Sequence, residues 1–137
     1  MRIFFDSSAL VIRYVQEPGT QQVNDLFAQT DQVFVSIIAL PEMVSALARK
    51  KNEKKVTAEQ FNERKSELIT DFQDFSVCDL TPEVVSQTLY LLERYSLRTL
   101  DAIHLSSAVV MKMELFVSSD TRQLKAAGAM KMKVLKV

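Results

Sequence analysis

Four acidic residues stand where carboxylates could act together in chemistry. Each lies at or just beyond the end of an apolar stretch, and they are Asp6, Glu42, Asp101 and Asp120. A carboxylate beside buried apolar residues costs free energy unless it is solvated, paired or bound to a cation. Carboxylate oxygens are the ligands that hard cations such as Mg²⁺ and Mn²⁺ prefer. A site of this kind suits metal-assisted hydrolysis of a phosphodiester by an activated water.

Other reactive side chains offer little competing chemistry. The chain has one cysteine and one histidine, so no Cys/His spacing suggests zinc and no internal disulfide can form. Cys78 stands in an expected strand, where a buried small apolar residue is the usual role of cysteine. No Ser–His–Asp arrangement and no cysteine nucleophile is evident.

The length and composition indicate one domain, which we expect to span residues 1–137. The chain is 47% hydrophobic and has only 2 Gly and 3 Pro, which leaves no room for long linkers. Lys plus Arg and Asp plus Glu number 17 each, so binding to nucleic acid would need a local basic patch or a metal ion. The apolar stretch that ends at Asp6 is too short for a signal peptide or a membrane span. We therefore expect a cytoplasmic protein with no membrane partner.

Short apolar runs alternate with amphipathic stretches along the chain. We predict strands at 2–5, 33–35, 77–80, 115–117 and 134–135. We predict helices at 9–15, from Thr20, at 38–51, 57–74, 82–95, 99–112 (capped by Thr99) and 120–127 (closed by Gly128), with a charged turn at 49–55. This alternation is typical of an α/β fold with a parallel sheet. Ligands bind at the carboxyl edge of such sheets, where all four acids can converge.

A structural explanation of the aspartates is also open. Aspartate is favoured at helix starts, where it caps free backbone N–H groups, and Asp6, Asp101 and Asp120 each lie at one. Asp101 is unusual because it is in phase with Leu105 and Ala108, on a helix that is apolar nearly all round. On spacing alone, capping and a shared site are equally good explanations.

Four motifs resemble those of the PIN-domain ribonucleases. They are Asp6-Ser7-Ser8-Ala9-Leu10, Leu40-Pro41-Glu42-Met43-Val44-Ser45-Ala46-Leu47, Leu100-Asp101-Ala102-Ile103-His104-Leu105 and Val117-Ser118-Ser119-Asp120-Thr121-Arg122-Gln123-Leu124. The third is the most specific match, and all four occur in family order over almost the whole chain. The compact size also resembles the VapC toxin branch of that family. The resemblance implies a PIN-like three-layer sandwich, in which helices flank a central, mostly parallel sheet.

The resemblance also implies an activity and partners. It implies a Mg²⁺- or Mn²⁺-dependent endoribonuclease whose acidic set is Asp6, Glu42, Asp101 and Asp120, which would bind the metal and act in catalysis. It further implies a homodimer that is the toxin of a type II toxin–antitoxin pair and is neutralised by a small antitoxin. An arginine of that antitoxin would be able to pair with the carboxylates.

Residues near the acids refine this expectation. Ser8 and Ser118 match the hydroxyl positions of the first and fourth motifs, so we expect them to orient Asp6 and Asp120 or to bind a metal water, with simple capping as the alternative. Some relatives carry a further acid where this chain has Arg122, which favours one tightly bound ion over two. His104 is expected to be a structural hydrogen-bonding histidine rather than a general base.

Basic residues could serve the RNA backbone. The stretch that holds Arg49, Lys50, Lys51, Lys54 and Lys55 is typical of a solvated turn, and contact with RNA phosphates is the alternative. Arg13 and Arg98 are further candidates.

Three other functions remain open on the sequence. A receiver-like phosphotransfer domain could use Asp79, but serines follow Asp6 where such domains carry a second acid. A non-catalytic PIN-like RNA- or protein-binding module would keep the same acids without turnover. Structure-specific DNA cleavage is the third, although the chain has no added DNA-gripping element.

Overall fold

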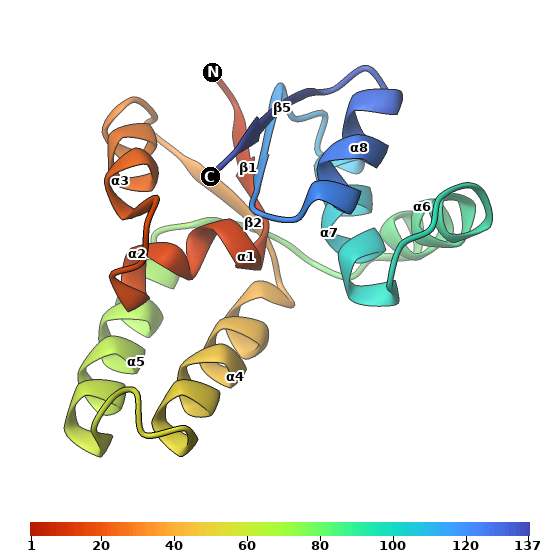
Figure 1. Ribbon diagram of the computed structural model, residues 1–137. Helices are drawn as coiled ribbons and strands as arrows, with labels where there is room; N and C mark the ends of the chain where they lie inside the picture. Colours follow the sequence, from red (N-terminus) through yellow and green to blue (C-terminus); the bar gives the residue numbers. More distant parts are fainter.

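A five-stranded parallel sheet lies at the centre of the computed structural model, which describes residues 1–137 (Figure 1). The strands are β1 (Ile3–Phe5), β2 (Val33–Ser36), β3 (Ser76–Cys78), β4 (Leu115–Ser118) and β5 (Lys133–Lys136). Their order is β3-β2-β1-β4-β5, and each neighbouring pair is parallel. The predicted α/β fold with a mostly parallel sheet is therefore confirmed.

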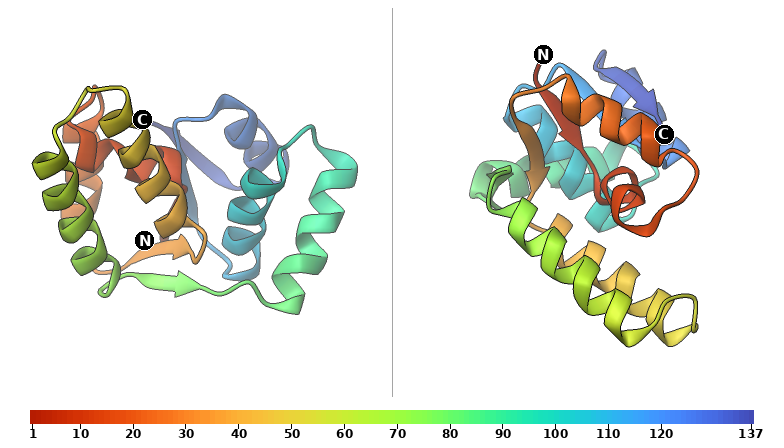
Figure 2. Two further views of the ribbon diagram at one scale, coloured as in Figure 1. Left: turned by 90° about the horizontal axis from the view of Figure 1, so that it is seen from below. Right: turned by 90° about the vertical axis from the view of Figure 1, so that its left-hand side faces the viewer.

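Helices cover both faces of the sheet and make a three-layer molecule. They are α1 (Ser7–Leu10), α2 (Ile12–Val15), α3 (Thr20–Ala28), α4 (Ala39–Asn52), α5 (Ala58–Phe72), α6 (Pro82–Arg94), α7 (Thr99–Val110) and α8 (Thr121–Ala129). Helices α1 to α5 lie on one side of the sheet and α6 to α8 on the other (Figure 2). None of them combines the length and the apolar character that a membrane span requires.

The two hydrophobic cores follow from the alternation of side chains along the strands. Ile3 and Phe5 point into the core beneath α1 to α5, whereas Phe4 between them points into the core beneath α6 to α8. Phe4 stacks on Phe116 of the neighbouring strand, with 5.7 Å between the ring centroids. Both faces of β1 are thus buried, which explains why its sequence is a continuous apolar run.

Three expectations about helix ends are wrong. The stretch 49–55 is not a turn throughout, because α4 continues to Asn52 and ends only where Lys54 takes a left-handed φ of 59°. Gly128 does not close α8 but lies inside it, and the left-handed residue that follows the helix is Lys131. Thr99 is the first residue of α7 rather than its cap.

Two further elements differ from the prediction in their extent. The expected helix at 9–15 is divided into α1 and α2, which meet at Val11. Strand β3 ends at Cys78, so Leu80 lies beyond it and is exposed. These changes leave the carboxyl edge of the sheet, where the acids lie, unaffected.

Candidate active site

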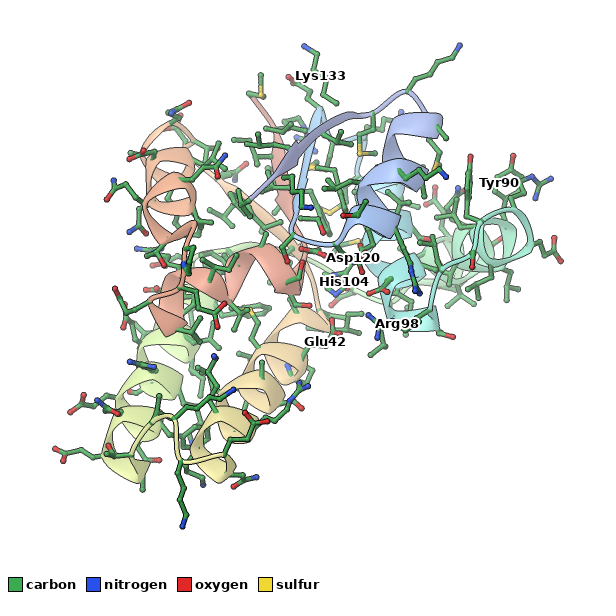
Figure 3. All side chains as sticks on the ribbon, in the orientation of Figure 1. Glu42, Tyr90, Arg98, His104, Asp120 and Lys133 are labelled. Carbon is green, nitrogen blue, oxygen red and sulfur yellow. The ribbon has the colours of Figure 1, made fainter.

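The four acids gather at the carboxyl edge of the sheet. Asp6 directly follows β1 and Asp120 follows β4, whereas Glu42 and Asp101 lie in the first turns of α4 and α7. All four line one cavity of about 180 Å³. Figure 3 shows Glu42 and Asp120 near the point where α1, α4 and α7 approach one another. The strand ends and helix starts therefore bring together residues that are far apart in the chain.

Asp6 is fully buried and is held entirely by neutral donors. The hydroxyl of Ser8 donates to its carboxylate at 2.8 and 2.9 Å, and the hydroxyl of Ser118 donates to Oδ2 at 2.8 Å. The backbone N–H of Ala9 donates at 3.0 Å, so Asp6 also caps α1. Gln123 Nε2 donates to Oδ2 at 2.7 Å. Capping and a place in the cavity therefore coincide at this residue.

Burial raises the pKa of the Asp6 carboxyl above its ordinary value. The charge of His104 and the hydrogen bonds from Ser8, Ala9 and Ser118 act in the opposite direction, but they do not outweigh the loss of solvation. No cationic side chain makes an ion pair with Asp6. The site therefore holds a carboxylate whose charge is poorly compensated by the protein itself.

Asp101 and Asp120 share one arginine. Arg98 Nε donates to Asp101 Oδ2 at 3.1 Å, and its Nη2 lies 3.9 Å from Asp120 Oδ2. Asp120 also caps α8 by accepting from the N–H of Arg122 at 2.8 Å, and its own N–H donates to the hydroxyl of Ser118 at 2.9 Å. The side chain of Arg98 is 78% exposed, so it covers the acids from the solvent side.

Glu42 belongs to a second polar cluster, which it forms with Ser7 and His104. Ser7 Oγ donates to Glu42 Oε1 at 2.9 Å, and His104 Nε2 makes a close hydrogen bond to the same oxygen. Burial alone would raise the pKa of Glu42, but the hydrogen bond and charge of His104, together with Ser7, lower it below its ordinary value. His104 is buried, and it holds the glutamate in place as a hydrogen-bonding partner.

Two arginines supply positive charge at the cavity. Arg49 and Arg98 both line it, from the end of α4 and the start of α7. Of the neighbouring lysines, Lys50 pairs with Glu17 at 2.7 Å and Lys55 pairs with Glu53 at 2.9 Å. The basic stretch thus delivers only Arg49 to the site.

Ser7 and Gln123 line the cavity but were not predicted as site residues from the sequence. Ser7 stood inside the first motif without an assigned role. Gln123 is 2% exposed although glutamine is mostly a surface residue. Its position among the buried residues of α8, three places after Asp120, was the only available signal.

The donor set fits Mg²⁺ or Mn²⁺ in kind, because it consists of carboxylate oxygens around a poorly compensated charge. In the observed arrangement, no group of three or more acidic, histidine or cysteine side chains is close enough to hold a metal ion. Gln123 Nε2 lies between Asp6 and Asp101, and Arg98 lies beside Asp101 and Asp120. N–H groups therefore occupy positions next to the oxygens that a cation would need.

Comparison with known proteins identifies the family. A family model described as the PIN domain matches residues 3–129, so the chain belongs to the PIN domain family. Within that family it is similar to Ribonuclease VapC45 of Mycobacterium tuberculosis (strain CDC 1551 / Oshkosh), with 28% identity over 113 residues that cover 80% of this chain and 76% of the relative. Ribonuclease VapC49 of Mycobacterium tuberculosis (strain ATCC 25618 / H37Rv) matches with the same identity and coverage. The resemblance seen in the motifs is confirmed.

Solved structures share the fold. A toxin-antitoxin complex from Klebsiella pneumoniae matches with a TM-score of 0.72 and 17% identity, over 98% of this chain and 96% of that one. VapC20 of Mycobacterium tuberculosis, described as a Sarcin-Ricin loop cleaving toxin, matches with a TM-score of 0.71 and 18% identity, over 92% of this chain and 95% of that one. VapBC2 from Rickettsia felis, bound to a promoter DNA fragment, has a TM-score of 0.71 at 13% identity, over 100% of this chain and 99% of that one. The PIN-like sandwich is therefore confirmed as the fold.

Proposed function

We propose that this protein is a metal-dependent endoribonuclease that hydrolyses RNA phosphodiester bonds and is the toxin of a type II toxin–antitoxin pair. The observation that carries the proposal is the single cavity lined by Asp6, Glu42, Asp101 and Asp120. The names of the relatives, both ribonucleases, support the same activity.

In this proposal, Asp6, Asp101 and Asp120 hold one Mg²⁺ or Mn²⁺ ion tightly. When bound, such a cation supplies an activated water and neutralises charge that grows on the phosphate. Ser8 and Ser118 keep the carboxylate of Asp6 in a fixed orientation, as their hydrogen bonds indicate.

Glu42 orients the attacking water or acts as a further ligand. Ser7 and His104 fix its Oε1, which leaves Oε2 as the oxygen available for this task. The lowered pKa of Glu42 keeps the carboxylate ionised, as either role requires.

Arg49 and Arg98 bind the oxygens of the RNA backbone beside the acids. A guanidinium donates two parallel N–H bonds to a phosphate, so a cavity edge with both arginines suits a phosphodiester. Arg98 is mostly exposed and can exchange its contacts with Asp101 and Asp120 for the phosphate.

Cleavage of a mixed cellular RNA pool with Mn²⁺ tests the activity. The Asp101→Asn variant should lose roughly a thousandfold or more in rate, because a catalytic cation contributes several kcal/mol to the transition state. The matched control is Asp31→Asn, an exposed residue just before β2, which should cleave like the parent. Excess EDTA should stop RNA cleavage by the parent and by the Asp31→Asn control. A folded Asp101→Asn variant with full activity would contradict the proposal.

A non-catalytic binding module is the competing function, and one contact favours it. The pairing of Arg98 with Asp101 and Asp120 shows that the acidic cavity accepts a guanidinium, which a partner protein could also supply. RNA or peptide binding without any cleavage by the metal-loaded protein would select this alternative.

We extend the proposal to two partners. A cognate antitoxin is supported by the structural neighbours, which include toxin–antitoxin complexes. A homodimer is supported by the exposed apolar residues Val85, Leu89 and Tyr90 of α6. Sedimentation of the purified protein, alone and with the antitoxin, tests both assemblies.

A further inference from the structure

Gln123 connects two acids that belong to different elements. It lies in the first turn of α8, and its Nε2 donates to Asp6 Oδ2 at 2.7 Å and to Asp101 Oδ1 at 3.1 Å. Both N–H bonds of the side-chain amide are therefore used on carboxylates. No other uncharged side chain donates to both Asp6 and Asp101.

The opposite end of the same amide has no partner. Gln123 Oε1 is buried and accepts no hydrogen bond, which is unusual because buried polar atoms are nearly always paired. The side chain thus satisfies the two carboxylates at the expense of its own oxygen. An unpaired buried oxygen at the acidic cavity is the kind of atom that a cation or its water would satisfy.

The two ends of the amide suit opposite charges. Ionised carboxylates attract the N–H end and repel Oε1, whereas a divalent cation attracts Oε1 and repels the N–H end. Rotation of the terminal torsion exchanges the two ends, and this torsion has a broad, roughly two-fold profile. Ser8, Ser118 and Ala9 continue to hold Asp6 while the amide turns.

We propose that Gln123 is a cation-responsive residue of this site. Its Nε2 aligns Asp6 and Asp101, and its Oε1 turns toward a divalent cation at these carboxylates, as a ligand or through one of the cation's waters. The assignment rests on the proposed function, because it adds Gln123 to the same metal site. It makes this glutamine a determinant of metal affinity.

Two substitutions separate this role from simple packing. Gln123→Met keeps the approximate shape and removes both polar ends. Gln123→Glu keeps the shape and replaces the N–H end by a second oxygen. Gln22→Glu, an exposed position on α3, is the control for the added charge. The measurements are Mn²⁺ titration by calorimetry and thermal unfolding in Mn²⁺ or in EDTA.

Each substitution has a defined expected result. Gln123→Met should bind Mn²⁺ about tenfold more weakly, which is the usual loss when a residue supporting a metal site is removed. Gln123→Glu should melt several degrees lower than the parent in EDTA, because three acids then face one another. Mn²⁺ should reverse this loss and should bind about tenfold more tightly, since the site gains a carboxylate. Gln22→Glu should match the parent in all measurements.

The outcomes distinguish this inference from the proposed function. If the parent binds Mn²⁺, Asp101→Asn does not, and Gln123→Met keeps the parental affinity, then the role of Gln123 is wrong and the metal site stands. The role of Gln123 is also wrong if Mn²⁺ fails to restore the stability of Gln123→Glu. If the parent binds no Mn²⁺, the metal dependence is wrong and the inference falls with it. If Gln123→Glu does not fold, the affinity of Gln123→Met decides.

Discussion

At the scale of single residues, the candidate site keeps a buried carboxylate that lowers the stability of the fold. Asp6 is fully buried and depends on neutral donors such as Ser8, Ser118 and Gln123. Burial raises its pKa, so the folded protein binds a proton at Asp6 more tightly than the unfolded chain does. A carboxylate of this kind is useful to a cation site and is unfavourable for folding alone.

The sign of this effect leads to a prediction for Asp6→Asn. In EDTA, stability from Asp6 falls as the pH rises through its raised folded-state pKa, and the asparagine variant escapes this loss. At about pH 8 the free energy of unfolding of the variant should be about 1 kcal/mol higher than that of the parent, which is a typical gain for a stabilising substitution. The difference should be smaller at about pH 5, because protonation of Asp6 in the parent increases as the pH falls. RNA cleavage should be lost.

Urea unfolding at both pH values measures this difference. Glu42, whose lowered pKa acts in the opposite direction, is present in both proteins and cancels in the comparison. Asp31→Asn is again the control and should show no pH-dependent gain. A variant that is less stable than the parent at both pH values would show that the charge of Asp6 is well compensated.

At the scale of elements, the helix that carries the clearest start signal lies away from the site. Thr57 accepts a hydrogen bond from the N–H of Gln60 at 3.1 Å, and Gln60 Oε1 accepts from the N–H of Thr57 at 2.9 Å. This reciprocal capping box begins α5, and no residue of α5 lines the acidic cavity. The cap therefore serves stability and not chemistry.

Thr57→Ala should separate these two properties. Loss of the cap should lower the free energy of unfolding by about 1 kcal/mol, while RNA cleavage per folded molecule stays at the parental rate. Thr70→Ala, an exposed position in the same helix, should not lower stability, because alanine favours the helix interior. A drop in cleavage by folded Thr57→Ala protein would mean that α5 is coupled to the site.

Local patterns predicted the elements better than their ends. Apolar runs located every strand, and the placement of the acids at strand ends and helix starts predicted their convergence. The charged residues 49–52 looked like a turn because polarity in a short window does not separate a solvated helix end from a loop. Gln123 could not be assigned, because its partners Asp6 and Asp101 are 117 and 22 residues away in the chain.

At the scale of the whole molecule, balanced charge limits how RNA can be bound. Basic and acidic residues number 17 each, so no overall attraction draws in a polyanion. Four carboxylates line the cavity, whereas Arg49 and Arg98 are its only cationic side chains. Affinity for the RNA backbone should therefore come from a few local contacts.

Salt dependence of RNA binding measures the number of these contacts. Neutralisation of two phosphates, one by each arginine, would give a slope of about −1.4 for the logarithm of affinity against the logarithm of salt concentration. Fluorescence anisotropy of a labelled single-stranded RNA in EDTA, which prevents cleavage, gives this slope. Arg49→Gln should make it shallower by about 0.7, the contribution of one phosphate on a single strand. Lys125→Gln, exposed on α8 and not part of the cavity, should leave it unchanged. A much steeper slope, or one that Arg49→Gln does not alter, would place the RNA on another surface of the molecule.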